Sequence, residues 1–291
     1  MKKTLSVILA VLMALGCVLM FASCGGGAEE TTAAADDTTA AEDTTAAEDT
    51  TAADEKTIVV GYTIYEPMNY KDADGKLVGF DTELAEKVFG NLGYTVIFQE
   101  IEWSSKYTDL DSNTIDCVWN GFTANTADDD GILRSEKVDF SYNYMENRQV
   151  IVVKADSTIA TAEDLNGKFA VAESGSAGEA YAKGFEGVAF KGFIKQTECL
   201  TEILSGTADF AVVDAQLAKA YVGTGDYADL KIVEDLSSDV EYYAIGFKKG
   251  SELTANVNAQ LEALAADGTI AALAAKYGVE NTAITDFADQ K

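Results

Sequence analysis

The stretch FAVVDAQLAKAYV, residues 210–222, contains the pattern that decides the fold. Its first part, Phe210–Val213, is a short apolar run typical of a buried strand, and Ala215–Val222 is predicted to be a helix. Asp214 stands at the junction between them. A buried strand that leads into a helix is the repeating unit of α/β proteins with largely parallel sheets.

The same alternation continues toward both ends of the chain. Further strands are predicted at residues 58–60, 96–101, 115–119, 149–153, 169–172, 230–233 and 243–247, and further helices at 81–92, 178–183, 197–204 and, as a pair, 251–277. Asp81 is expected to cap the first of these helices. In such sheets ligands bind beyond the carboxyl ends of strands, which selects the positions after Gly61, Trp119, Ala172 and Val213.

The composition excludes several classes of function. The chain has 291 residues and no histidine, which rules out Ser-His-Asp catalysis and histidine metal sites. Residues 1–55 hold ten carboxylates and two lysines, which leaves 39 acidic and 19 basic residues, a net charge of −20, in residues 56–291. A body this acidic repels nucleic-acid phosphates. No metal or other cofactor is expected.

Two of the four cysteines, Cys117 and Cys199, lie in the body of the chain without the spacing of a metal or redox motif. They fall in segments that we assign to different domains. We therefore expect buried, small apolar side chains, with a disulfide between them as the alternative.

The N-terminus is typical of an export signal. Four residues, two of them lysines, precede an apolar run from Leu5 to Ala22, and a cysteine follows closely. Residues 21–24, Phe-Ala-Ser-Cys, resemble a lipobox, so residues 1–23 are predicted to be a lipoprotein signal peptide and Cys24 the lipidated residue. Cys17 offers an alternative box, and a plain transmembrane anchor is a further alternative.

Residues 24–55 repeat Thr-Thr-Ala-Ala four times, each time followed by acidic residues. Such a segment cannot bury a core, and its carboxylates repel one another, so we expect a disordered, extended tether. The body would then be held by a lipid at the outer face of the cytoplasmic membrane.

Five motifs, in order along the chain, resemble those of the extracellular solute-binding proteins of family 3, which serve polar amino-acid ABC importers. They are Gly75–Asp81 (GKLVGFD), Val138–Ser141 (VDFS), Ala162–Lys168 (AEDLNGK), Thr207–Asp214 (TADFAVVD), and Asp267–Thr269 with Lys276-Tyr277. The resemblance extends from about residue 58 to residue 277 nearly without gaps.

The resemblance implies an α/β fold of the type II periplasmic-binding-protein class, with two lobes joined by two crossover strands. Lobe 1 would comprise residues 56–147 and 243–291, and lobe 2 residues 148–242. It implies a monomeric binding protein, not an enzyme, that closes on a small amino acid in the cleft and passes it to a membrane permease.

The resemblance also implies which residues bind the ligand. Arg134, five residues before Asp139, matches the arginine that clamps the ligand carboxylate, for which its planar guanidinium is suited. Asp214 matches the carboxylate that takes the α-ammonium. The other matched positions are Tyr65 over the ligand, Thr123 and Gly121 as hydrogen-bonding positions, Gly175, Ser176 and Ala177 as a turn whose amides hold the carboxylate, and Tyr62, Trp119 and Glu173 around the ligand side chain.

The chain departs from the family pattern at residues 126–132, an added loop that carries Asp128, Asp129 and Asp130. We expect this loop to be solvated. Glu173, with no cation in an obvious side-chain position, favours a polar or basic amino acid as the ligand. Two alternatives are an enzyme like the cyclohexadienyl dehydratases, with Glu173 as general acid, and a surface sensor protein.

Overall fold

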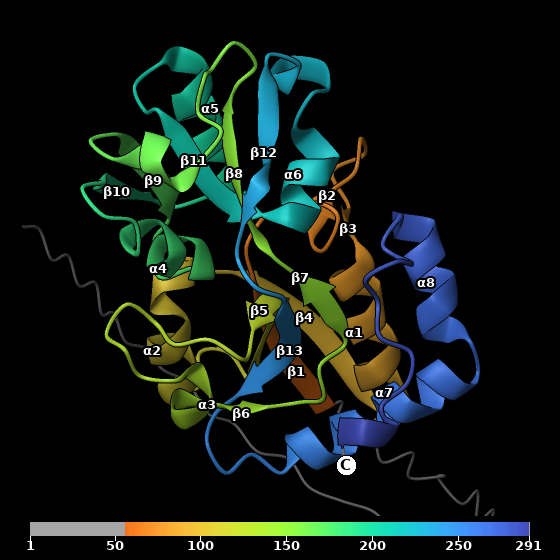
Figure 1. Ribbon diagram of the computed structural model, residues 1–291. Coiled ribbons are helices and arrows are strands. Elements are labelled where there is room, and N and C mark those ends of the chain that lie inside the picture. Colours follow the sequence, from red (N-terminus) through yellow and green to blue (C-terminus); the bar gives the residue numbers. More distant parts are fainter. Residues whose placement is uncertain (1–55, 291) are drawn as a thin grey trace, which may run out of the picture. The chain divides into compact units, whose positions relative to one another are not determined.

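This computed structural model describes residues 56–290 of the chain. They form two large β-sheets flanked by helices, and one two-stranded sheet (Figure 1). The predicted signal peptide (1–23), the lipidation site Cys24 and the tether (24–55) lie outside the described residues. The chain passes between the two sheets at Arg148 and again over residues 238–240. We call the sheet that contains the first strand, with its helices, lobe 1, and the other lobe 2.

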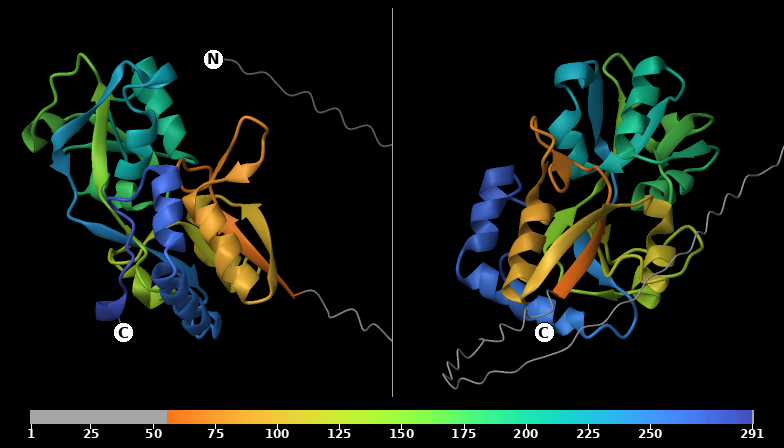
Figure 2. Two further views of the ribbon diagram at one scale, coloured as in Figure 1. Left: turned by 90° about the vertical axis from the view of Figure 1, so that its right-hand side faces the viewer. Right: turned by 180° about the vertical axis from the view of Figure 1, so that it is seen from behind.

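Lobe 1 combines the two ends of the described chain. Its strands in sheet order are β4 (Tyr94–Glu100), β1 (Lys56–Tyr62), β5 (Cys117–Thr123), β13 (Glu241–Phe247) and β6 (Asp139–Phe140), with β7 (Met145–Asn147) also paired to β13. Its helices are α1 (Phe80–Asn91), η1 (Trp103–Ser105), α2 (Lys106–Asp111), α3 (Arg134–Lys137), α7 (Leu253–Ala266), α8 (Thr269–Tyr277) and η4 (Ala288–Gln290). The hairpin of β2 (Tyr70–Lys71) and β3 (Leu77–Val78) precedes α1, and Figure 2 shows α7 and α8 beside α1.

Lobe 2, uppermost in Figure 1, is one continuous segment of the chain. Its strands in sheet order are β10 (Ala189–Phe193), β9 (Phe169–Glu173), β11 (Phe210–Asp214), β8 (Gln149–Lys154) and β12 (Leu230–Ser237). Its helices are η2 (Ala162–Leu165), α4 (Ala177–Lys183), α5 (Gln196–Ser205), α6 (Ala215–Tyr221) and η3 (Gly225–Tyr227).

Both sheets are mixed, with three parallel strands and antiparallel strands beside them. Strands β4, β1 and β5 are parallel in lobe 1, and β10, β9 and β11 are parallel in lobe 2. Strand β13 runs antiparallel to β5, and β8 antiparallel to β11, because these strands enter from the other lobe. The expectation of largely parallel sheets therefore holds only for the strands that alternate with helices.

Strand β11 shows why residues 210–213 are apolar at every position. Phe210 and Val212 pack in the same cluster as Ala182 of α4, on one face of the sheet. Ala211 and Val213 pack with residues of α5 and α6 on the other face. Because helices cover both faces, no alternation of polar and apolar residues remains.

One further feature of the described residues, the state of the two cysteines, agrees with expectation. Cys117 and Cys199 are buried and free, one in each lobe, so the alternative of a disulfide between them is excluded. Between residues 56 and 290, no helix combines the length and the apolar character that a membrane span requires.

Candidate functional site

A narrow cavity lies between the lobes, at the carboxyl ends of the parallel strands. Its lining comes from lobe 1 (Tyr65, Trp103, Asn120, Gly121, Thr123, Arg134) and from lobe 2 (Glu173, Ser176, Ala177, Gln196, Asp214). The four strand ends selected from the sequence all contribute to this lining. The cavity is therefore formed only where the two lobes meet.

The lobe 1 wall is built around Gly121, which lies in β5 where its pairing with β13 is irregular. Its φ of +58° lies in the left-handed region, and a Cβ there would stand 2.7 Å from Cε1 of Tyr65. The Tyr65 hydroxyl in turn forms a 2.7 Å hydrogen bond with the hydroxyl of Tyr243. Only glycine permits this approach of the backbone to the two rings.

Asp81 holds the backbone of Gly121 in place and does not cap α1, so that expectation was wrong. The N-cap of α1 is Gly79, and Asp81 is fully buried inside the first turn. Its Oδ2 accepts hydrogen bonds of 2.8 Å from the Gly121 amide and from the Tyr144 hydroxyl. Burial raises the pKa of Asp81 to about 7.

Arg134 forms the cationic end of the cavity, and all of its nitrogens point to acceptors. Nε donates to Oδ1 of Asp128 at 2.8 Å, and Nη1 donates to the carbonyl of Thr123 at 3.2 Å. Nη2 donates across the cleft to the carbonyl of Gly175 at 3.3 Å. The side chain is only 1% exposed, so its charge is well shielded from water.

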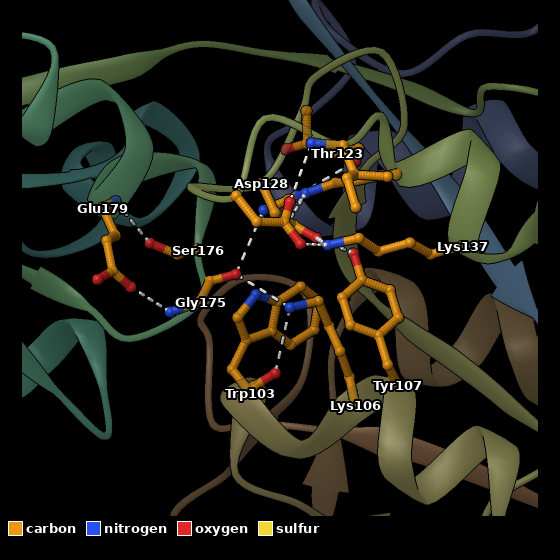
Figure 3. A network of polar contacts seen from close by, with 12 residues as sticks. Trp103, Lys106, Tyr107, Thr123, Asp128, Lys137, Gly175, Ser176 and Glu179 are labelled. Atoms are coloured by element: carbon orange, nitrogen blue, oxygen red, sulfur yellow. Dashed lines mark hydrogen bonds and ion pairs between the residues drawn. The ribbon is translucent and has the colours of Figure 1, made fainter.

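Asp128 comes from the added loop and is not solvated as we expected for that loop. Its Oδ2 accepts from the Tyr107 hydroxyl at 2.6 Å and from Nζ of Lys137 at 2.7 Å (Figure 3). Burial alone would raise its pKa, but Arg134 and these two donors lower the pKa of Asp128 to about 2. The carboxylate therefore stays ionised and keeps the guanidinium of Arg134 in one orientation.

Asp214 forms the anionic end, where neutral amides surround the carboxylates. Oδ2 accepts from Nε2 of Gln196 at 2.5 Å, and Oδ1 accepts from Gln149 at 2.6 Å and from Asn147 at 2.8 Å. The side-chain amides of Asn147 and Gln149 also donate to Oε1 of Glu241, each at 2.6 Å. Burial raises the pKa of both carboxyls, and for Glu241 the nearby Asp214 raises it further.

Glu173 adds a second carboxyl group, beside Asp214, to the lobe 2 wall of the cavity. Its side chain is buried at the end of β9 and lines the cavity. Burial, and then the charge of Asp214, raise the pKa of Glu173 to about 8. With no ligand present the group therefore holds a proton near neutral pH, and a cation placed beside it would favour its ionised form.

Two of the residues assigned from the sequence lie elsewhere. Trp119 is fully buried in the lobe 1 core, where its ring packs against Phe89 and Tyr144. Tyr62 packs edge-on against Phe98, and neither Trp119 nor Tyr62 lines the cavity. We therefore leave both out of the ligand-binding set.

The turn at the start of α4 also differs from its expected role. The Gly175 amide donates to Glu179 at 2.5 Å, and the Ser176 amide donates to the carbonyl of Glu173 at 3.2 Å. These two amides, which were expected to hold a ligand carboxylate, thus have partners inside lobe 2. Only Ser176 and Ala177 of this turn line the cavity.

Sequence reasoning missed three lining residues, Trp103, Asn120 and Gln196. Trp103 follows the end of β4, so applying the strand-end rule to every predicted strand would have found it. Asn120 bonds to the backbone and hydroxyl of Thr63, with Oδ1 at 3.0 Å from the amide and 2.7 Å from Oγ1. Gln196 carries no local signal, because its role depends on where Asp214 lies.

The comparison with known proteins gives the family. The profile of the bacterial extracellular solute-binding proteins, family 3, matches residues 58–280. The arginine-binding extracellular protein ArtP of Bacillus subtilis (strain 168) is 32% identical over 218 residues, which cover 73% of this chain and 82% of ArtP. The chain belongs to this family, and its fold is the two-lobe fold of type II periplasmic binding proteins.

Solved structures agree with this assignment. An ancestral arginine-binding protein bound to glutamine is 36% identical, with a TM-score of 0.70 over 78% of this chain and 99% of that one. The ancestral amino acid-binding protein AncCDT-1, a precursor of cyclohexadienyl dehydratase, is 30% identical, with a TM-score of 0.67 over 76% of this chain and 95% of that one.

Proposed function

We propose that this protein is the substrate-binding component of an amino-acid ABC importer and that it closes its two lobes around a basic or polar amino acid. The observation that carries the proposal is a buried interlobe cavity with a guanidinium at one end and carboxyls at the other. A zwitterion needs both charges, shielded from water, in one site. The names of the relatives, which include arginine-binding proteins, support the same class of ligand.

Each end of the cavity would bind one end of the amino acid. Arg134 would take the α-carboxylate through the remaining hydrogen on each Nη atom, since Nε donates to Asp128 and each Nη already donates once to a backbone carbonyl. Asp214 would take the α-ammonium and Thr123 would add a hydrogen bond, while the rings of Tyr65 and Trp103 would contact the ligand's aliphatic part. Residues from both lobes are needed, so binding stabilises the closed state.

The balance of charge in the cavity favours a basic side chain. Glu173 and Asp214 line the cavity, and Glu241 shares two amide donors with Asp214, whereas Arg134 is the only cation in the lining. One ammonium can neutralise one of these carboxylates. A second positive charge, on the side chain of the ligand, would neutralise a second carboxylate. That pairing would offset the cost of burying the ligand's second charge.

The place of the protein outside the cell follows from the N-terminal pattern. Residues 1–23 would be removed on export, Cys24 would carry the lipid, and residues 24–55 would tether a monomeric body near its permease. Radiolabelled palmitate on the wild type and its absence from Cys24→Ala would test this. Label that remains on the variant would shift the anchor to Cys17.

Thermal unfolding of the purified protein with each of the twenty amino acids, ornithine and cystine tests the binding function. A ligand that binds only the folded protein stabilises it by about 2.7 kcal/mol at a hundredfold excess over its dissociation constant. We expect basic amino acids to raise the midpoint most and Arg134→Ala or Asp214→Ala to abolish the rise. No rise with any amino acid would refute the proposal.

One observation favours a second function. The Glu173 carboxyl is protonated near neutral pH in the ligand-free cavity, which is the state of a general acid, and one structural neighbour is the precursor of a dehydratase. Incubation with prephenate distinguishes the two functions. Formation of phenylpyruvate that is lost in Glu173→Gln would establish the enzyme, and no product is the result that the binding function predicts.

A further inference from the structure

Lys106, the first residue of α2, is a buried lysine without an ion-pair partner. It is 1% exposed, and the ion pairs formed within residues 56–290 do not include it. Its Nζ lies 4.5 Å from the ring centre of Tyr107, 5.0 Å from that of Trp103 and 5.7 Å from that of Phe122. Such aromatic contacts favour a cation but do not neutralise it.

The hydrogen bonds of Lys106 show what the buried group does. Nζ donates to the carbonyl of Trp103 at 3.3 Å within lobe 1, and to the carbonyl of Gly175 at 3.0 Å in lobe 2 (Figure 3). Arg134 donates to the same Gly175 carbonyl at 3.3 Å. Two basic side chains of lobe 1 therefore donate to a single acceptor across the cleft.

The lobe 2 turn is shaped to offer that acceptor. Gly175 has a φ of +74°, its amide donates to Glu179, and Ser176 caps α4 by accepting from the amide of Glu179 at 3.1 Å. The lobes approach so closely here that a Cβ on Gly175 would stand 3.2 Å from Cα of Ser104. The carbonyl is thus held rigidly toward lobe 1, and only glycine fits the contact.

The added loop contributes to the same side of the cleft. Asp128 fixes Arg134, and Asp129 pairs with Lys183 of α4 across the cleft at 3.0 Å. That second pair is largely exposed and contributes little by itself. The bond of Lys106 to the Gly175 carbonyl is buried instead. Burial, and then the charge of Arg134, lower the pKa of Lys106 to about 7, and Nζ can donate to this carbonyl in its charged and in its neutral form.

We propose that Lys106, through its bond to the Gly175 carbonyl, is a closing residue that stabilises the closed form of this protein whatever ligand the cavity holds. The inference rests on the proposed closure of the lobes around the ligand. It does not require that the ligand be basic, since Lys106 does not line the cavity. Lys106 sets how long the lobes stay closed, and the cavity lining sets which ligand is chosen.

The test compares Lys106→Met with the wild type and with Lys249→Met, which removes an exposed lysine that pairs with Asp139 inside lobe 1. Dissociation of arginine and of glutamine is followed by tryptophan fluorescence, because Trp103 lines the cavity. We expect Lys106→Met to speed dissociation about tenfold for both amino acids, in line with the loss of one buried hydrogen bond across the cleft. Lys249→Met should stay within about twofold of the wild type.

Small-angle scattering of the ligand-free proteins is the second arm, and it needs no ligand. Lys106→Met should have a larger radius of gyration than the wild type, and saturating arginine should bring the two together. Unchanged dissociation with an unchanged radius would overturn the inference. Faster dissociation of only one of the two amino acids would also overturn the inference, since Lys106 would then contribute to ligand selectivity.

Failure of the proposed function has a different signature. A wild type that binds neither amino acid refutes that function, whereas the ligand-free scattering still tests the closing contact. Lys106→Gln, too short to reach Gly175 but polar, repeats the test if the methionine variant does not fold. An open Lys106→Gln supports the inference, and one as compact as the wild type refutes it.

Discussion

The two ends of the cavity hold opposite charges by different means. At the cationic end, Arg134 is fixed by an ionised carboxylate, Asp128, and by two backbone carbonyls. At the anionic end, Asp214 and Glu241 are held by the neutral amides of Asn147, Gln149 and Gln196. The charge of Arg134 is thus partly neutralised by Asp128, whereas the hydrogen-bond donors to Asp214 and Glu241 carry no charge.

This difference explains why the ends respond differently to an empty site. Ionised Asp128 keeps Arg134 oriented with no ligand bound, so the carboxylate-binding end is preorganised. At the other end burial raises the pKa values of Glu173, Asp214 and Glu241, so protons can stand in for the missing cation. A positively charged ligand would displace those protons.

Loss of the cationic end should have the largest effect. Arg134→Ala removes the partner of the ligand carboxylate and leaves Asp128 buried with less compensation, so arginine binding should weaken at least about a hundredfold. Isothermal titration measures this. A Lys137→Ala variant, which keeps Arg134, should lose far less, and equal losses would mean that the effect is one of folding.

The anionic end should separate ligands by their charge. Glu173→Gln keeps the shape of the side chain but cannot become an anion, so arginine binding should fall about tenfold while glutamine binding stays within about twofold. Titration of both amino acids into both proteins gives the four constants. Unchanged arginine binding would show that Glu173 does not face the ligand's positive group.

Preorganisation of Arg134 by the added loop should have a moderate effect. Asp128→Asn keeps a hydrogen-bond acceptor but removes the charge, so amino-acid binding should weaken about fivefold. Asp130→Asn changes a carboxylate of the same loop that does not touch Arg134, and it should leave binding within about twofold. Equal effects of the two variants would assign the loss to the loop as a whole.

The smallest effect concerns the stability of the ligand-free protein. The pKa of Glu173 is raised to about 8, above the ordinary value of about 4.3 in an unfolded chain. Between these values the folded protein binds a proton that the unfolded chain does not, so the contribution of Glu173 to the free energy of unfolding falls as pH rises. Glu173→Gln should therefore flatten the decline in urea midpoint between pH 5 and pH 8. Parallel profiles of variant and wild type would contradict this.

The sequence was sufficient for the architecture and for the ends of the cavity. Strand–helix alternation and the strand-end rule located the lining after β1, β5, β9 and β11. Matching the family motifs assigned Arg134 and Asp214 to the two ends of the cavity, although the added loop at residues 126–132 lengthens the segment before Arg134. The strand–helix alternation is a local pattern, and the motifs resemble those of a known family. A single sequence is therefore enough to show both.

The sequence was not sufficient for the direction of side chains in fully buried strands. All seven residues of β5 are buried, so no alternation tells the cavity face from the core face, and Trp119 was assigned to the wrong one. Asp128 depends on the path of a loop, and Lys106 begins a helix of six residues, too short for a periodic pattern. These placements depend on tertiary contacts.

Titration of arginine against agmatine, the same molecule without its α-carboxylate, tests the central claim of a cavity with two charged ends most directly. The account predicts that agmatine binds the wild type at least about a hundredfold more weakly than arginine, and that Arg134→Ala binds the two alike. Equal affinity of the wild type for arginine and agmatine would show that Arg134 does not receive the carboxylate, and the charged ends would not define the site.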